Sequence, residues 1–115
     1  MEKEDAIAAL SALAQAARLD IFRLLVQAGP NGLAAGQIAE RIGMPANTLS
    51  FHLNQLRHAG LLRCRRESRS LIYTAEFAAM NALLAYLTEN CCQGDATACG
   101  LPAGAPETVC RDSAD

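Results

Sequence analysis

The chain has 115 residues, 51% of them hydrophobic, with a net charge of −2 and five cysteines. This size allows one domain with a modest core that forms without a metal or disulfide to support it. No segment approaches the roughly 18 uninterrupted apolar residues that a membrane-spanning helix needs, and the acidic N-terminus lacks the basic-then-apolar pattern of a secretion signal. We therefore expect a soluble, cytoplasmic protein with no membrane partner.

The first half of the chain predicts four helices. Apolar residues recur at helical spacing in two runs, which are Ile7, Leu10 and Leu13, then Leu19, Phe22 and Leu25. They indicate two helices with a break near residues 15–18, and Gly29 and Pro30 end the second one. A short helix over 35–42 and another over 45–59 follow, separated by a tight turn that contains Gly43. This arrangement is typical of a helix-turn-helix.

The helix predicted over 45–59 has two contrasting faces. At about 100° per residue, Leu49, Leu53 and Leu56 share one face, which we expect to pack. The opposite face is polar and available to DNA, and an asparagine there can make paired hydrogen bonds with adenine. The candidate DNA-binding residues of this helix are Asn47, Thr48, Ser50, Phe51, His52 and Asn54.

Four of these candidates have further interpretations. Asn47 or Thr48 is positioned to cap the helix. Phe51 either contacts a thymine methyl group or packs against the following hairpin. His52 lies beside the leucine face, so we interpret it first as a half-buried packing residue and second as a phosphate contact.

An arginine-rich hairpin is predicted directly after this helix. Arginines flank Glu67 and Ser68, and the β-favouring residues 71–73 follow, which indicates two short strands joined by a solvated wing. Residues 45–73 carry a net charge of +4, against −1 for residues 1–44 and −5 for residues 74–115. A local positive patch suits DNA despite the acidic chain, although such a patch can also be merely solvated. We expect the backbone or minor groove of DNA to be clamped by Arg65, Arg66 and Arg69.

One more helix is predicted over 76–87. Its apolar stripe consists of Phe77, Met80, Leu84 and Leu87. A small domain has few internal faces left, so we expect this helix and the Ile7–Leu13 helix to pair across a two-fold homodimer interface, the alternative being an internal core helix. Periodicity is lost beyond Glu89, which predicts a folded domain over 1–89 and a flexible tail over 90–115, largely disordered without a ligand.

The segments ALAQAARLDIFRLLVQAG, GLAAGQIAERIGMPANTLSFHLNQLRHAGLL and RRESRSLIY follow one another in this chain. Their order, their spacing and the Ser-x-His-Leu-x-x-Leu-x-x-Ala-Gly-Leu pattern that begins at Ser50 resemble the ArsR/SmtB family of bacterial metal-sensing repressors over about residues 8–88. The resemblance implies a mainly α winged helix-turn-helix with five helices and a two-stranded wing. It also implies a homodimer that binds double-stranded operator DNA, represses its operon and dissociates from the operator when a metal or metalloid binds.

Two binding sites known in that family do not fit this chain. Arsenic sensors of one type carry cysteines in the third helix, whereas the matching residues 32–38 contain none. Zinc-sensing relatives use Asp and His ligands along the last helix, whereas residues 77–87 contain neither. The resemblance therefore implies neither of these two sites here.

The remaining thiols are Cys91, Cys92 and Cys99, a layout similar to arsenite sensors whose thiolate site lies in the C-terminal region. Trivalent arsenic or antimony is a soft ion that suits three sulfur ligands, and the segment 93–98 can close the loop at small entropic cost. We therefore expect a metalloid-responsive repressor with arsenic or antimony as effector and no cofactor for folding. Arsenite, antimonite and methylated arsenicals, and the operator sequence, stay open.

Alternatives remain for these cysteines. They could be incidental or form a disulfide in a redox-switched repressor, or Cys110 could add a fourth thiolate for zinc or cadmium. An enzyme is not expected, because no histidine or cationic group lies near Cys91, Cys92 and Cys99 in sequence. Cys64, in the first strand of the wing, is interpreted as a small packing residue and not as a ligand.

Overall fold

The computed structural model describes residues 1–94, which form five α-helices and three short strands. The chain divides into two units, residues 1–83 and residues 84–115. Cys99 and Cys110 lie outside the described residues. The functional division expected after residue 89 therefore stays a prediction.

Two helices open the chain, α1 over Lys3–Leu13 and α2 over Ala16–Ala28, and they confirm the predicted break. The residues that α1 buries are alanines, namely Ala6, Ala9 and Ala12. Small side chains let α1 approach its neighbours α2 and α4 closely. Ile7 and Leu10, whose spacing predicted the helix, stay 55% and 43% exposed. The helix is thus apolar on both faces, and its larger apolar side chains face solvent.

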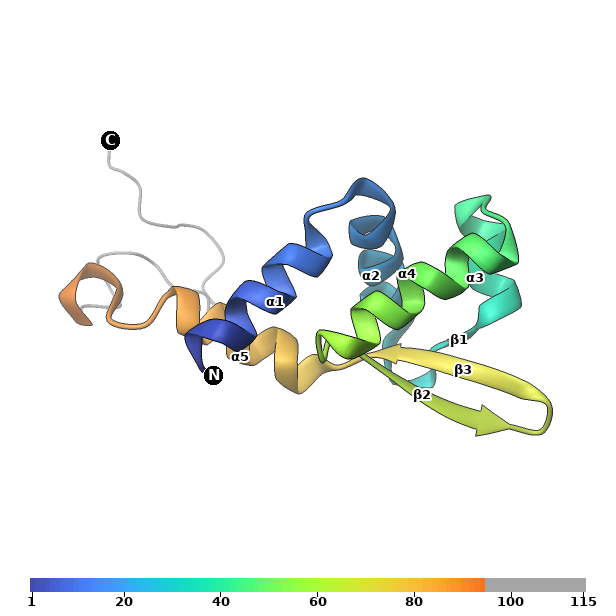
Figure 1. The fold of residues 1–115 in the computed structure, drawn as a ribbon. Helices are drawn as coiled ribbons and strands as arrows, with labels where there is room; N and C mark the ends of the chain where they lie inside the picture. The colour runs from blue at the N-terminus through green and yellow to red at the C-terminus, as the bar shows by residue number, and fades with distance from the viewer. Residues whose placement is uncertain (95–115) are drawn as a thin grey trace. The chain divides into compact units, whose positions relative to one another are not determined.

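The helix-turn-helix consists of α3 over Ala35–Ile42 and α4 over Ala46–His58 (Figure 1). Gly43 ends α3 in the left-handed conformation, with φ 77°, and its amide donates to the Ala39 carbonyl at 2.8 Å. Pro45 is the N-cap of α4 and contributes no side-chain hydrogen bond. The expectation that Asn47 or Thr48 caps this helix is therefore wrong, because a proline with extended backbone already sets its start.

The core of this unit lies between α2, α3 and α4. The predicted leucine face of α4 is confirmed, since Leu49, Leu53 and Leu56 are each at most 1% exposed. Ile21 and Leu25 of α2 and Ile38 of α3 are 0% exposed and complete the same core. Burying a leucine side chain stabilises the fold by about 2 kcal/mol. The packing of α4 is thus fixed by one face, which leaves the other face free.

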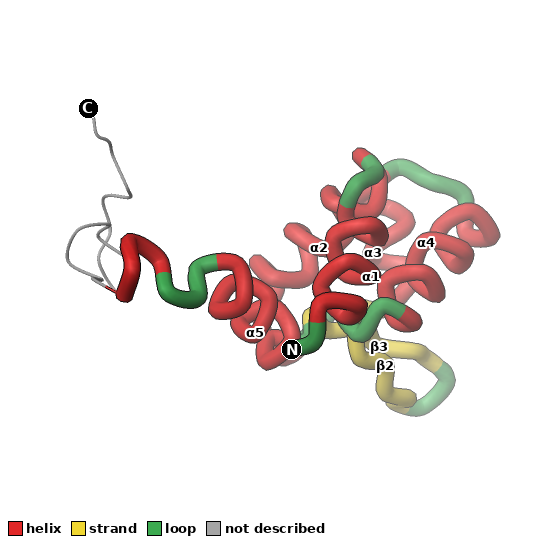
Figure 2. The backbone as a smooth tube through the Cα atoms, turned by 60° about the vertical axis from the view of Figure 1, so that its left-hand side comes forward, coloured by secondary structure: helices red, strands yellow, loops and turns green. Residues whose placement is uncertain are grey.

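The wing is an antiparallel hairpin of β2 over Leu62–Glu67 and β3 over Ser70–Ala75. Figures 1 and 2 show the hairpin extending away from helices α1 to α4. A third strand, β1 over Leu33–Ala34, pairs with β3, so the sheet has the order β1-β3-β2. The expected two-stranded wing thus joins a three-stranded sheet, because two residues are too few to show any periodicity.

Gly32 permits the close approach of β1 to β3. Its φ is +70°, and a Cβ at this position would collide with the Tyr73 carbonyl oxygen and the Thr74 methyl group. The short turn η1 over Gly29–Asn31 leads into this contact. Glycine is thus required here both by conformation and by space.

The last described elements are α5 over Phe77–Leu87, close to the predicted bounds, and a short turn η2 over Cys91–Gly94. Leu83 is buried at 6% exposure, whereas Leu84 and Leu87 are each 55% exposed. Among residues 1–94 no helix combines the length and the apolar character that crossing a membrane would require.

Candidate DNA-binding surface and cysteine segment

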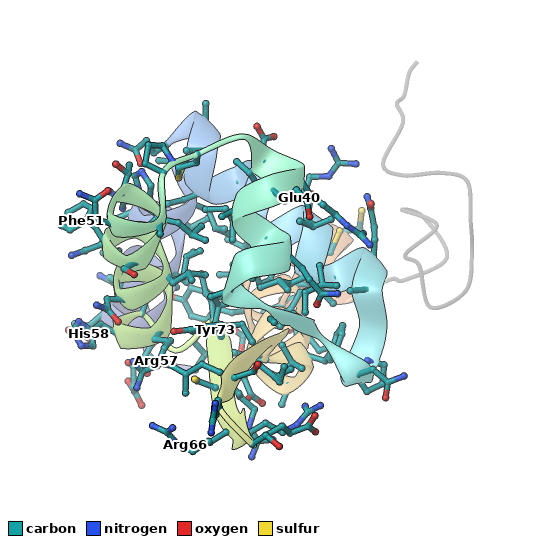
Figure 3. All side chains as sticks on the ribbon, turned by 90° about the vertical axis from the view of Figure 1, so that its right-hand side faces the viewer. Glu40, Phe51, Arg57, His58, Arg66 and Tyr73 are labelled. Atoms are coloured by element: carbon teal, nitrogen blue, oxygen red, sulfur yellow. The ribbon has the colours of Figure 1, made fainter. Side chains whose placement is uncertain are left out.

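The polar face of α4 is open to solvent. The exposed candidates on it are Asn47, Thr48, Ser50, Phe51 and Asn54, and the aromatic side chain of Phe51 is 55% exposed. Figure 3 shows Phe51 and His58 on the side of α4 that is turned away from α3. A helix that is anchored by buried leucines and exposes short polar side chains has the composition needed to enter a major groove.

Two asparagines on this face already use their carbonyl oxygens. Asn47 Oδ1 accepts a hydrogen bond from the Thr48 amide at 2.9 Å, and Asn54 Oδ1 accepts one from Arg57 Nη1 at 3.3 Å. A paired contact with adenine uses both the oxygen and the nitrogen of the carboxamide. Asn54 can make this contact if its oxygen shares or exchanges a long, exposed bond, which costs little in water.

His52 is the exception among the candidates, because it is only 8% exposed. Its Nδ1 accepts a hydrogen bond from Arg18 Nε of α2 at 3.2 Å. Burial first, and the charge of Arg18 second, lower the pKa of His52 below its usual 6.5. The ring is therefore neutral at pH 7 with its proton on Nε2. This placement supports the packing interpretation, and a phosphate contact by His52 stays a prediction.

Arg18 was not found by sequence reasoning. Its guanidinium carbon lies 5.9 Å from the centre of the Phe51 ring, and the Phe51 and His52 rings meet edge to face at 5.6 Å. Arg18 and His52 are 34 residues apart, so no local pattern could have paired them. The contact appears only once α2 and α4 pack together.

The wing arginines differ in what holds them. Arg65 Nε donates to Glu67 Oε2 at 2.9 Å, and its Nη2 donates to the Asn31 carbonyl at 3.0 Å. Arg63 forms an ion pair with Glu76 at 3.2 Å. Within residues 1–94 no ion pair engages Arg66, which Figure 3 shows on the hairpin, or Arg69. Arg66 and Arg69 are thus the more available of the predicted phosphate contacts, and Arg65 also braces the wing against η1.

At the base of the wing, Cys64 of β2 lies opposite Tyr73 of β3. Burial is the main cause that raises the pKa of Tyr73. The electrostatic interaction with Cys64 and a side-chain hydrogen bond with Cys64 raise it further, whereas the positive charge of Arg57 lowers it. Tyr73 is 7% exposed and Cys64 is half-buried. Cys64 therefore has the environment of a packing and hydrogen-bonding residue.

The cysteine segment begins just after α5. Cys91 Sγ and Cys92 Sγ lie 3.7 Å apart in η2. No group of three or more metal-ligating side chains occurs in the part of the chain that the structure describes, and Cys99 lies beyond it. The site of Cys91, Cys92 and Cys99 therefore stays a prediction. Two of its three proposed ligands, Cys91 and Cys92, are adjacent in the described part of the chain.

Comparisons with known proteins agree with this architecture. A helix-turn-helix domain model matches residues 13–65. The transcriptional activator HlyU of Vibrio cholerae is 32% identical over 97 residues, which cover 83% of this chain and 87% of HlyU. The solved structure of reduced HlyU is 30% identical with a TM-score of 0.60, and the match covers 78% of this chain and 92% of that one.

Two further solved structures share this architecture. A homodimeric winged helix-turn-helix DNA-binding domain from Mycobacterium bovis, described as a possible ArsR-family regulator, is 29% identical with a TM-score of 0.61, and the match covers 80% of this chain and 85% of that one. An ArsR-like regulator from Rhodococcus sp. RHA1 shares the fold, with a TM-score of 0.69 at 23% identity over 82% of this chain and 86% of that one. With its helix-turn-helix, its wing and these relatives, the chain belongs to the ArsR/SmtB family of winged helix-turn-helix transcriptional regulators.

Proposed function

We propose that this regulator is a homodimeric repressor that binds operator DNA through α4 and the wing and is released when trivalent arsenic or antimony binds its C-terminal thiolates. The observation that carries the DNA-binding part is the polar face of α4 beside a wing in which Arg66 and Arg69 lack an ion-pair partner among residues 1–94. Asparagine carboxamides can hydrogen-bond to adenine edges in the major groove, and guanidinium groups bind phosphates through charge-assisted hydrogen bonds.

A second copy of the chain would cover its exposed apolar faces. Ile7 and Leu10 on α1 are 55% and 43% exposed, and Leu84 and Leu87 on α5 are each 55% exposed. Apolar side chains that recur on a helix face and remain in water usually mark an interface. The homodimeric relative from Mycobacterium bovis favours the same assembly. Two recognition helices in one dimer would then contact two half-sites of the operator.

The effector part rests on the two adjacent sulfur atoms. Cys91 Sγ and Cys92 Sγ are 3.7 Å apart and Cys92 is disulfide-bonded in this structure, so one soft ion could bond to both sulfurs once that disulfide is reduced. Arsenous acid would form one As–S bond with each thiol and release one water molecule for each bond. Cys99 would supply the third sulfur. Because the segment follows α5, closing it onto the ion would alter the end of a helix that we assign to the dimer interface.

The test is release of a labelled duplex, taken from the promoter of the protein's own gene, upon titration of the reduced protein with arsenite. Cys92→Ser should need a much higher arsenite concentration than the parent, because it removes one of the three sulfurs. Cys64→Ser is the matched control, since Cys64 lies in the wing, and it should respond like the parent. Release of Cys92→Ser at the parental concentration would reject the effector part and leave the DNA-binding part intact.

A redox-switched repressor is the second candidate. The specific observation in its favour is that Cys92 is disulfide-bonded in this structure, together with a relative whose structure was solved in a reduced form. Hydrogen peroxide would convert two thiols into a disulfide and two molecules of water. Release of the same duplex by peroxide without metalloid, and no release by arsenite, would favour this candidate over the first.

A further inference from the structure

Arg18 lies outside the helix-turn-helix and the wing, yet its side chain contacts the recognition helix. It is the third residue of α2, and its Nε donates to His52 Nδ1 of α4 at 3.2 Å. The guanidinium carbon lies 5.9 Å from the centre of the Phe51 ring. A guanidinium group is planar, so when its Nε–H donates a hydrogen bond on one side, its two NH₂ groups lie on the opposite side.

Within residues 1–94 those NH₂ groups have no counter-charge. Over the same residues the Arg18 side chain forms neither an ion pair nor a further hydrogen bond, and the residue is half-buried. A partly buried cation without an anionic partner is unfavourable, and a guanidinium binds phosphate with two parallel hydrogen bonds. The position is therefore suited to an anion that arrives from outside.

The surroundings of Arg18 offer further hydrogen-bond donors. A recess of about 240 Å³ is lined by Ala8, Ser11, Ala12, Arg18, Gln55, His58 and Ala59. The Ser11 hydroxyl, the Gln55 amide and the His58 ring can donate to an oxygen, and no carboxylate lines the recess. Figure 3 shows His58 on the same side of α4 as Phe51. The recess thus borders the face of α4 that we assign to DNA.

We propose that Arg18 is a phosphate-contacting residue of the DNA interface and that His52 is a positioning residue, which holds the guanidinium by accepting its Nε hydrogen. The proposal rests on the DNA-binding surface proposed above. It assigns a third cationic contact, contributed by α2, beside Arg66 and Arg69 of the wing. In this assignment His52 acts on DNA only through Arg18.

The neutral state of His52 fits this role. Nδ1 can accept a hydrogen bond only when it carries no proton, and burial together with Arg18 favours that state. The described elements that pack against α4 are α1, α2, α3 and β2. Of their charged side chains, Arg18 is the one whose charge lowers the pKa of His52. An acceptor without charge can orient Arg18 without neutralising it, so the full positive charge stays available to a phosphate.

The test is the salt dependence of binding to a labelled duplex of mixed sequence that is long enough for two half-sites. Arg18→Gln should lower the slope of log K against log salt by about 0.9, as expected for the loss of one phosphate contact. Arg23→Gln is the matched control, because Arg23 is an exposed arginine of the same helix, and it should keep the parental slope. A parental slope for Arg18→Gln, with a reduced slope for Arg66→Ala, would overturn the proposal alone.

Two other outcomes are equally decisive. A parental slope for both Arg66→Ala and Arg18→Gln would reject the proposed DNA-binding surface as well. If circular dichroism shows that Arg18→Gln does not fold, Arg18→Lys takes its place. That variant keeps the charge and loses the two parallel hydrogen bonds, so it should bind more weakly at an unchanged slope, and parental affinity would overturn the proposal.

The role of His52 needs a separate readout. His52→Leu fills the buried position with an apolar side chain and removes the hydrogen-bond acceptor. His52→Asn instead places an acceptor oxygen near the position of Nδ1. When Arg18→Gln is combined with His52→Leu, it should change the salt slope by less than it does in the parent. When it is combined with His52→Asn, it should change the salt slope by about as much as in the parent. An Arg18 effect of full size in the leucine background would overturn the positioning role.

Discussion

The recognition helix and the wing present their DNA-facing side chains by opposite means. α4 is fixed by residues without charge, since Leu49, Leu53 and Leu56 are each at most 1% exposed and its exposed face begins with short polar groups. Residues 65–71 of the wing are exposed, and its strands carry arginines held by Glu67, Glu76 and a backbone carbonyl. Apolar packing therefore positions the side chains of the helix, whereas ion pairs and hydrogen bonds position the arginines of the hairpin.

This difference separates two properties of a DNA-binding protein. Side chains on a rigid helix can distinguish base edges, because their positions are defined to within a hydrogen-bond length. Arginines on an exposed hairpin contact phosphates, which are alike in every sequence. We therefore expect sequence preference to depend on α4 and general affinity to depend on the wing, with Arg18 adding to the second property from α2.

The largest effect is expected from the packed face of α4. Leu56→Ala should lower the free energy of unfolding by about 3 kcal/mol, because it leaves a cavity beneath a side chain that is 0% exposed. Leu71→Ala in the wing, where the side chain is 39% exposed, should lower it by about 0.5 kcal/mol. Urea unfolding of both variants measures the difference. Equal losses would contradict the view that packing fixes α4 more firmly than the exposed part of the wing.

Sequence preference is the next property to examine. Asn54→Ala should cost about 1–3 kcal/mol of binding at one base pair of the promoter fragment and little on mixed-sequence DNA. Gln27→Ala, which removes an exposed carboxamide of α2, is the control and should leave both affinities unchanged. Competition titrations with single-base variants of the fragment measure this. A loss that is equal on all sequences would move Asn54 from the group of base contacts to that of phosphate contacts.

Charge in the wing should have a smaller effect that does not depend on sequence. Arg66→Ala should lower the salt slope by about 0.9 and weaken all duplexes alike. Arg63→Ala should change the slope less, because Arg63 is already paired with Glu76 at 3.2 Å. Anisotropy titrations at several salt concentrations measure both. If Arg63→Ala gave the larger change, the ion pair in the free protein would be no guide to the complex.

Much of this comparison could be predicted from the sequence, because it depends on local patterns. Gly43 and Pro45 mark the turn between α3 and α4, and the leucine spacing shows which face of α4 is buried. The predicted α3 bounds match the structure, and those of α4 differ by one residue at each end. Turn residues and helical periodicity act over a few residues, so they are visible without a fold.

Contacts between distant segments could not be predicted in this way. β1 has two residues and exists because Gly32 lets it approach β3. Arg65 was expected to bind DNA only, and its bond to the Asn31 carbonyl joins residues 34 apart in the sequence. The pairing of Arg18 with His52 spans the same separation. Each of these contacts depends on how elements pack, and packing leaves no local mark in the sequence.

The smallest expected effect concerns the one buried histidine of α4. The folded protein holds the pKa of His52 below the 6.5 of the unfolded chain, through burial and then Arg18, so the unfolded state takes up the proton first as the pH falls. The contribution of His52 to stability is therefore complete above pH 6.5 and is lost as the pH falls through the lower, folded pKa. Urea unfolding of the parent between about pH 8 and pH 5 should show this loss.

Replacing the titrating group isolates its share of that loss. His52→Asn cannot take up a proton in this range, so the gap in unfolding free energy between parent and variant should be constant above pH 6.5 and shift against the parent below it. His58→Asn, which makes the same substitution at the exposed histidine of the same helix, is the matched control. A His52→Asn curve parallel to the parent throughout would mean that His52 is protonated equally in both states. The contact with Arg18 could then not depend on a neutral ring, and the uncharged anchoring of α4 would have to rest on its leucines alone.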